Sequence, residues 1–136
     1  MKFELRGLEE LKARLDSLAK GMAGALKEAS GEAALYAHSQ VPPYPTAPTG
    51  STYRRTGTLG RSITTDVRTL GSKYVGVIGT ATVYAPWVIS EKPVGSRGPQ
   101  AWMHVGRWWT LHGVVRGAHD EIMRIYRKAI LGLFGG

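Results

Sequence analysis

Four prolines within seven residues, Pro42, Pro43, Pro45 and Pro48, constrain the fold of this 136-residue chain more than any other feature. Proline has no backbone N–H and a fixed φ, so this segment cannot continue a helix or lie in the middle of a sheet. We therefore predict a stiff, extended arm or loop at about residues 40–52. A spacer is the more ordinary role for such an arm, and a proline-rich recognition site is the alternative.

Before the arm, apolar residues recur at helical spacing. Leu8, Leu11, Leu15 and Leu18 follow steps of three and four residues with charged residues between them, which is typical of an amphipathic helix over about residues 7–20. Two glycines, at positions 21 and 24, then each weaken the helix by roughly 1 kcal/mol relative to alanine. A second helical stretch, rich in small residues, runs to about residue 39. The pattern predicts a kinked helix or a pair of helices.

After the arm, residues 61–79 show the alternation of a β-hairpin. Ile63, Thr65 and Val67 share one face, and a turn at 70–73 leads into a second strand over 74–79. A third strand is predicted over 83–90, bent or placed at the sheet edge because of its proline.

From residue 111 to residue 133 apolar residues again follow a helical period, and Arg116, Arg124, Arg127 and Lys128 fall largely off that stripe. The order of elements predicts a single α+β domain over residues 1–136. It consists of the N-terminal helix, an antiparallel β-meander of three to four strands and a long C-terminal helix.

The net charge of +8 is placed unevenly. Residues 1–49 carry six basic and six acidic residues, whereas residues 50–136 carry twelve and four. A basic half favours an anionic partner, either nucleic acid or an acidic protein surface. A solvated basic face that keeps the protein soluble is the equal alternative.

The sequence lacks the signatures of an enzyme. His112 and His119 are two turns apart rather than the one turn that lets a helix chelate a metal. The neighbouring carboxylates Asp120 and Glu121 diverge by about 100° on a helix. There is no nucleophile elbow and no cysteine, which also excludes disulfides and thiolate metal sites. We expect no catalytic residues, metal or cofactor, and the absence of a long apolar run predicts no membrane partner.

Several aromatic and basic residues are candidates for contact with another molecule. Tryptophan and arginine dominate protein interfaces and can also stack on single-stranded nucleic acid, although core packing is the more ordinary role for the rings. The three arginines around residue 55 suit carboxylate or phosphate, or are simply solvated. The candidate interface residues are Pro43, Tyr44, Pro45, Tyr53, Arg54, Arg55, Arg61, Trp87, Trp102, Arg107 and Trp108.

The order of motifs resembles a known family. The segment of residues 53–63, Tyr-Arg-Arg-Thr-Gly-Thr-Leu-Gly-Arg-Ser-Ile, follows the proline arm and precedes two strands. Gly79-Thr80, the run Tyr84-Ala85-Pro86-Trp87-Val88 and a long helix come next. This order, over roughly residues 5–130, is similar to the minor tail-component proteins (head–tail joining, tail-completion or neck proteins) of long-tailed bacteriophages.

The resemblance implies a structural virion protein without catalysis, made in the host cytoplasm and located at the head–tail junction. Six copies, or twelve, would form a homo-oligomeric ring as a connector, tail-completion or tail-terminator layer. It would meet portal-proximal adaptor or stopper proteins on one side and tail-tube or terminator proteins on the other, with non-specific contact to the DNA in the channel. The residues alone leave one alternative, a small basic nucleic-acid-binding module.

In this interpretation, the segment 53–63 joins the proline arm to the first strand. Thr56 and Gly57 would make the turn, and Leu59 and Ile63 would anchor the segment to the core. The arginines of the segment would then face a neighbouring subunit or the channel.

Overall fold

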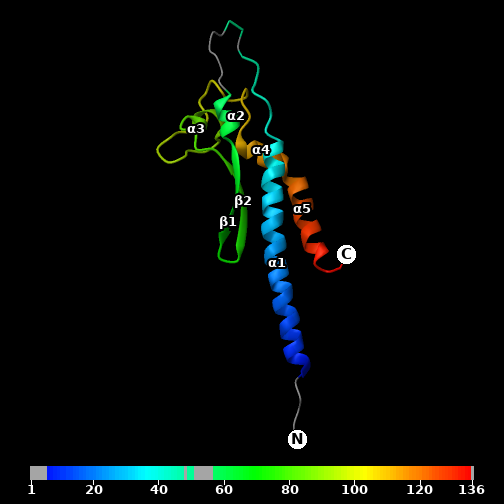
Figure 1. Ribbon diagram of the computed structural model, residues 1–136. Helices are drawn as coiled ribbons and strands as arrows, with labels where there is room; N and C mark the ends of the chain where they lie inside the picture. Colours follow the sequence, from blue (N-terminus) through cyan, green and yellow to red (C-terminus); the bar gives the residue numbers. More distant parts are fainter. Residues whose placement is uncertain (1–5, 48, 51–56, 136) are drawn as a thin grey trace.

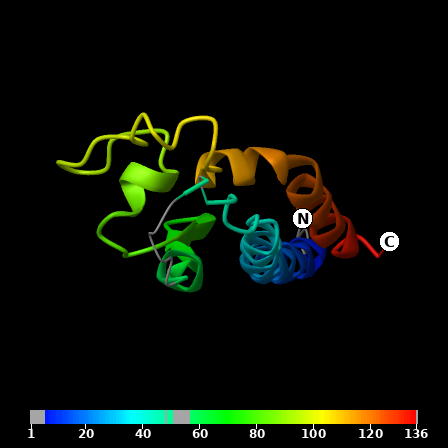
Figure 2. The same ribbon diagram turned by 90° about the horizontal axis from the view of Figure 1, so that it is seen from above.

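The computed structural model describes residues 6–47, 49–50 and 57–135, with side chains from residue 9 onward. The elements along the chain are α1 (Arg6–Ser39), α2 (Thr58–Ser62), β1 (Thr64–Leu70), β2 (Lys73–Gly79), α3 (Ala85–Ile89), α4 (Leu111–Gly117) and α5 (His119–Gly132). Helix α1 is the longest element, and Figure 1 shows it between the β-hairpin on one side and α5 on the other. The view from above (Figure 2) confirms this arrangement. The fold is α+β, as predicted.

The middle of α1 presents small side chains, which lets its neighbours approach closely. Ala29 and Ala33 are buried against Ile125 of α5. Ser30 is fully buried; its hydroxyl donates to the carbonyl of Leu26 at 2.8 Å and shares a 2.7 Å hydrogen bond with the hydroxyl of Tyr126. The small-residue stretch of the sequence therefore becomes the packing surface of α1.

The hairpin lies directly on this surface. Strands β1 and β2 are antiparallel, with Thr64 opposite Gly79, and the turn between them contains Gly71 with φ of +63°. At one point of this contact, a Cβ added to Gly76 would lie 2.4 Å from the main-chain oxygen of Ser30. Only glycine fits there. The predicted hairpin is confirmed, and its register places Val67 opposite Gly76.

Helix α1 is one continuous element rather than two helices. Gly21 and Gly24 both lie inside it. A Cβ at Gly21 would be 3.4 Å from the side chain of Leu133, so the chain beyond α5 packs against the helix at this glycine. We attribute the continuity to this packing, because tertiary contacts override weak intrinsic propensity.

The predicted third strand is wrong. Residues 85–89 form the short helix α3, and the described part of the chain contains a two-stranded sheet instead of three or four strands. Pro86 lies in the first turn of α3. A backbone N–H there has no acceptor within the helix, so proline loses no hydrogen bond, and its fixed φ suits the helix. The same proline that indicated a strand edge therefore begins a helix.

The C-terminal region, predicted as one long helix, forms two helices, α4 and α5, which meet at the buried residue Ala118. Val114 and Ile125 of the predicted apolar stripe are also buried, whereas Val115, on the same predicted stripe, is 39% exposed. The basic residues off the stripe are exposed.

Candidate interaction surface

A second small core lies at the end of the molecule beyond the hairpin, where α2 and α3 meet the segment 90–110. Leu59, Ala85 and Ile89 are buried there. Gly57, with φ of +75°, precedes α2, and Leu59 and Ile63 are only 3% and 4% exposed. Both predicted anchors of the segment 53–63 are therefore confirmed as core residues.

Tyr44 ties the described end of the proline arm to this core. Its hydroxyl accepts a hydrogen bond of 2.7 Å from the backbone N–H of Gly60. The centre of its ring lies 5.1 Å from the ring centre of Trp108, and the ring centres of Trp108 and Trp109 are 6.1 Å apart. Two of the predicted interface residues, Tyr44 and Trp108, are thus brought together, and both are partly buried in an aromatic cluster.

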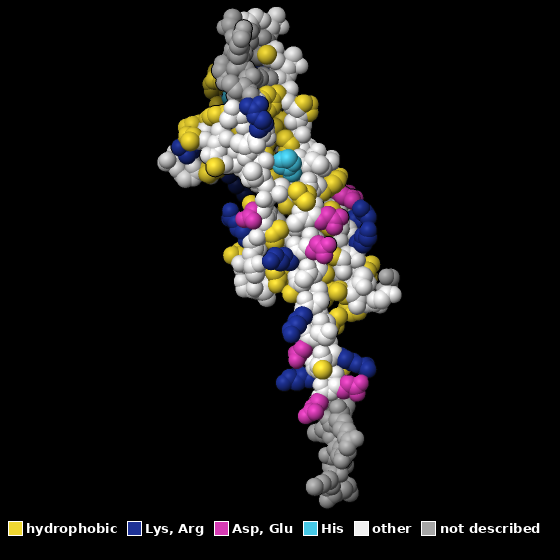
Figure 3. Space-filling model, viewed as in Figure 1, with side chains coloured by type: hydrophobic (Ala, Val, Ile, Leu, Met, Phe, Trp, Pro, Cys, Tyr) yellow, Lys and Arg dark blue, Asp and Glu magenta, His cyan; other side chains and the backbone are white. Residues whose placement is uncertain are grey.

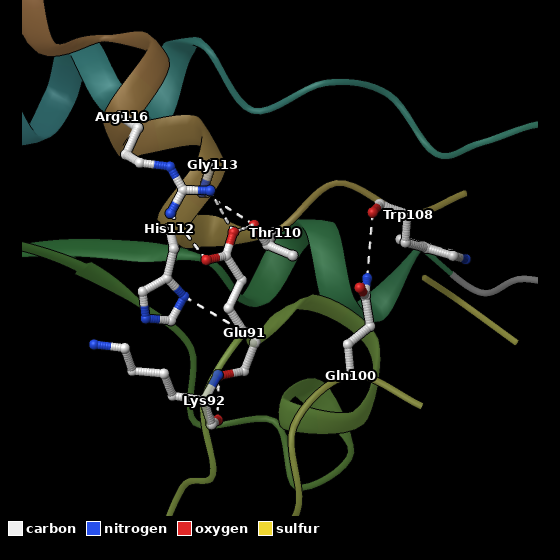
Figure 4. A network of polar contacts seen from close by, with 9 residues as sticks. Glu91, Lys92, Gln100, Trp108, Thr110, His112, Gly113 and Arg116 are labelled. Atoms are coloured by element: carbon white, nitrogen blue, oxygen red, sulfur yellow. Dashed lines mark hydrogen bonds and ion pairs between the residues drawn. The ribbon is translucent and has the colours of Figure 1, made fainter. Parts of the chain in front are cut away.

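Hydrogen bonds hold the irregular segment 90–110 in place. The backbone N–H of Gln100 donates to the carbonyl of Ser90 at 2.7 Å, and its side-chain amide donates to the carbonyls of Val88 at 2.7 Å and Trp108 at 3.2 Å. The N–H of Ala101 donates to the carbonyl of Trp87 at 2.7 Å. Gln100 therefore contacts both ends of the segment; Figure 4 shows its contact with Trp108.

An ion pair fastens the same segment to α4. The guanidinium of Arg116 donates to the two carboxylate oxygens of Glu91 at 2.9 and 2.5 Å, and the hydroxyl of Thr110 donates to the carboxylate at 2.7 Å. That hydroxyl also accepts from the N–H of Gly113 at 3.0 Å and so caps α4. The hydrogen bond from Arg116, and next that from Thr110, lowers the pKa of Glu91 to about 2. The carboxylate therefore stays charged below the pH at which an ordinary glutamate becomes protonated, and Figure 4 shows its contacts with Arg116 and Thr110.

The segment that is held in this way carries large apolar side chains on its outside. Trp102 is 84% exposed, Val105 62%, Val94 51% and Met103 50%. Trp87 of α3 is 41% exposed, and the guanidinium of Arg97 lies 5.7 Å from the centre of its ring. We call this set, with Arg97, the tryptophan surface; Figure 3 shows apolar side chains on the surface at this end of the molecule.

The remaining candidate residues have varied positions. Pro43, Arg61 and Arg107 are exposed, and Pro45 is partly buried. The other three, Tyr53, Arg54 and Arg55, lie outside the described residues. The structure thus separates the candidates into exposed residues, such as Trp87 and Trp102, and partly buried residues that pack the core.

An apolar groove of about 500 Å³ lies beside the tryptophan surface, and no sequence pattern predicted it. Its lining includes Ile78, Thr80, Pro86, Ile89, Leu111 and Val115. These residues come from β2, the turn after it, α3 and α4, so no local motif connects them. The pair of Glu91 and Arg116 at 25 residues' separation was missed for the same reason.

Comparisons with protein-family models, curated proteins and solved structures found no match to this chain. Among the described residues, no group of three or more His, Cys, Asp or Glu side chains is placed to hold a metal ion. No helix in that part of the chain is long and apolar enough to cross a membrane.

Proposed function

We propose that this chain is a structural protein of the bacteriophage neck, and that it forms a ring that joins the DNA-filled head to the tail. The observation that carries the proposal is the tryptophan surface: large apolar side chains and arginine, exposed on a segment that hydrogen bonds hold in a fixed conformation. Tryptophan and arginine are the residues that contribute most at protein interfaces. A segment ordered in advance loses less entropy on binding.

The extent of exposed surface supports an assembly role. Among the described residues, the large apolar side chains that are exposed include Leu11, Leu15, Val94, Trp102, Met103 and Val105. Exposed apolar side chains gathered in one region, as on the tryptophan surface, mark contact sites. We infer that partner subunits cover this apolar surface in the assembly.

A ring requires that each copy contact the next through two different surfaces. We propose six copies, or twelve, with portal-proximal adaptor or stopper proteins on one side of the ring and tail-tube or tail-terminator proteins on the other. The basic second half of the chain suits a channel through which DNA passes, because its charge opposes that of the phosphates.

Deletion of the gene from the phage or prophage that carries it tests the proposal. DNA-filled heads and separate tails should accumulate without joining, as counted by electron microscopy of the lysate. Wild-type protein supplied from a plasmid should restore complete particles, and Trp102→Ala should restore far fewer. Leu70→Ala, which changes a residue 63% exposed at the hairpin turn, serves as the matched control and should restore them fully. Complete, infectious particles formed without the protein would refute the neck role.

The alternative of a nucleic-acid-binding module keeps one specific observation in its favour, the free face of Trp102 on a segment that also carries Arg97 and Arg107. It requires salt-sensitive binding to a fluorescein-labelled oligonucleotide, measured by fluorescence anisotropy. Binding that Trp102→Ala abolishes, together with normal particles in the deletion strain, would favour this alternative. No binding at low salt would eliminate it.

A further inference from the structure

The N-terminal end of α1 extends beyond the rest of the molecule. Helix α5 runs back along α1 and ends at Gly132, and Leu133 is the neighbour that a Cβ at Gly21 would meet. Residues 6–20 of α1 continue past this point (Figure 1). We call these residues the overhang; at roughly 1.5 Å per residue it is about 22 Å long.

The overhang repeats the face of α1 that α5 covers. Leu11, Leu15 and Leu18 precede Ala29, Ala33 and Tyr36 by 18 residues each, which is about five full turns of an α-helix. The three later residues pack against α5 in the core. The three leucines, which we call the leucine face, therefore continue the helix-packing seam of the domain where no described helix of this chain covers it.

The leucine face is open. Leu11 is 51% exposed and Leu15 is 56% exposed, whereas Leu18, nearer to α5, is partly buried. Leucines spaced by four and three residues on one helix are the packing residues of helix pairs. The covered part of the same seam is occupied by a helix, so a helix is also the shape of occupant that fits its continuation.

Charges beside the leucine face define the chemistry of this occupant. By helical position, Arg14 and Lys12 are the nearest charged residues on its two sides. Arg14 pairs with Glu10 at 3.2 Å, but both side chains are largely exposed, and such a pair contributes little. Charges that flank a helix-pairing seam set the choice of partner. We propose that the overhang binds an amphipathic helix of a partner protein whose apolar stripe is flanked by Asp and Glu.

A second copy of this chain in antiparallel orientation fits less well. If two overhangs paired in antiparallel orientation about a point midway between Leu11 and Leu15, Lys12 and Arg14 would each approach the same residue of the other copy. Like charges at these positions are destabilising. The inference rests on the proposed assembly role, and it adds the chemical class of one partner.

The test uses the purified full chain and two synthetic peptides of three heptads, both with leucine at the a and d positions. One peptide carries glutamate at e and g, and the other carries lysine. Fluorescence anisotropy should show binding of the glutamate peptide but not the lysine peptide. Affinity should fall severalfold between about 0.05 and 0.5 M salt, because the flanking charges are exposed.

Variants locate the binding. Leu11→Ser/Leu15→Ser should weaken binding at least about tenfold, since two half-exposed leucines lose their apolar contacts. Leu35→Ser changes a leucine of α1 that is 62% exposed and lies off the leucine face, and it should bind as the wild type does. Both variants should unfold at the wild-type temperature, because the altered side chains lie outside the core.

Three binding results would overturn the inference: no binding of the glutamate peptide, equal binding of both peptides, or undiminished binding by the double variant. A wild-type dimer in sedimentation velocity that the double variant loses would also overturn it, in favour of a second copy as the occupant. These measurements use the isolated chain, whereas the head–tail joining assay uses particles, so failure of one is distinguishable from failure of the other.

Discussion

The contact between β2 and α1 at Gly76 makes a sharp prediction about stability. A methyl group at this position would lie 2.4 Å from the main-chain oxygen of Ser30, 3.3 Å from its carbonyl carbon and 3.4 Å from the Cβ of Ala34. The closest of these atoms belongs to the backbone of a long helix, so no side-chain rotation relieves the contact. Gly76→Ala therefore forces the hairpin away from α1.

The magnitude follows from two opposing effects. Removing a glycine from a strand normally stabilises the fold by about 0.5–1 kcal/mol, because the unfolded chain loses freedom. Overpacking a tight contact typically costs about 1–3 kcal/mol and sometimes more. We expect the clash to dominate, with a net loss of about 1–3 kcal/mol in the free energy of unfolding. For a domain of this size, that loss lowers the Tm by roughly 3–12 °C.

Gly79→Ala is the matched control, because it lies in the same strand and a Cβ there would meet nothing within 4 Å. Urea unfolding followed by circular dichroism should show a lower midpoint for Gly76→Ala at an unchanged m-value, and an equal or higher midpoint for Gly79→Ala. Adding Ala34→Gly should not rescue Gly76→Ala, since the main-chain contact remains. A Gly76→Ala protein as stable as the wild type would refute the close packing of hairpin and helix.

Three further predictions concern other contacts. The pKa of the Glu91 carboxylate is lowered from the ordinary 4.5 to about 2. Its contribution to the free energy of unfolding is therefore complete above pH 4.5 and is lost as the pH falls toward 2. The difference in urea midpoint between wild type and Glu91→Gln should be constant from pH 7 to 5 and then shrink. A difference that stays unchanged down to pH 2 would contradict the ion pair with Arg116. Tyr126→Phe removes the 2.7 Å hydrogen bond to Ser30 and should cost about 0.5–1.5 kcal/mol, and a double-mutant cycle with Ser30→Ala should show coupling between the two positions. Leu59→Ala should lower the free energy of unfolding by about 2–4 kcal/mol because Leu59 is only 3% exposed. Leu70→Ala, at a residue 63% exposed, should change it by less than about 0.5 kcal/mol. Equal effects of the two substitutions would argue against the core around α2.

Local patterns predicted the hairpin well and the segment after it poorly. Alternation of apolar and polar residues, with a glycine turn, places β1 and β2 within a few residues of their observed bounds. The run at 83–90 is short and apolar, and such runs do not distinguish a strand from a buried helix. Ile89 is buried in both interpretations, so burial alone could not decide between them.

The candidate site shows more clearly which features cannot be predicted from the sequence. Trp102 and Trp108 are equivalent in the sequence, as aromatic residues among basic ones, yet one is 84% exposed and the other packs on Tyr44. What separates them is the bracing of the segment by Gln100, whose partners lie 8 and 12 residues away along the chain. No periodicity or motif encodes these contacts, and only the folded chain reveals which ring faces outward.

The distribution of apolar side chains links the fold to its proposed role. Among the described residues, six of the eleven buried hydrophobic residues are alanines, at positions 29, 33, 34, 37, 85 and 118. Leu11 and Leu15 of the overhang and Trp102 remain exposed to solvent. Alanine buries little area, so the domain is held by close approach of backbones rather than by large side chains. Substitutions at the exposed leucines and Trp102 should therefore leave the isolated chain stable and impair the proposed assembly, whereas substitutions at the alanines and Gly76 should lower the free energy of unfolding.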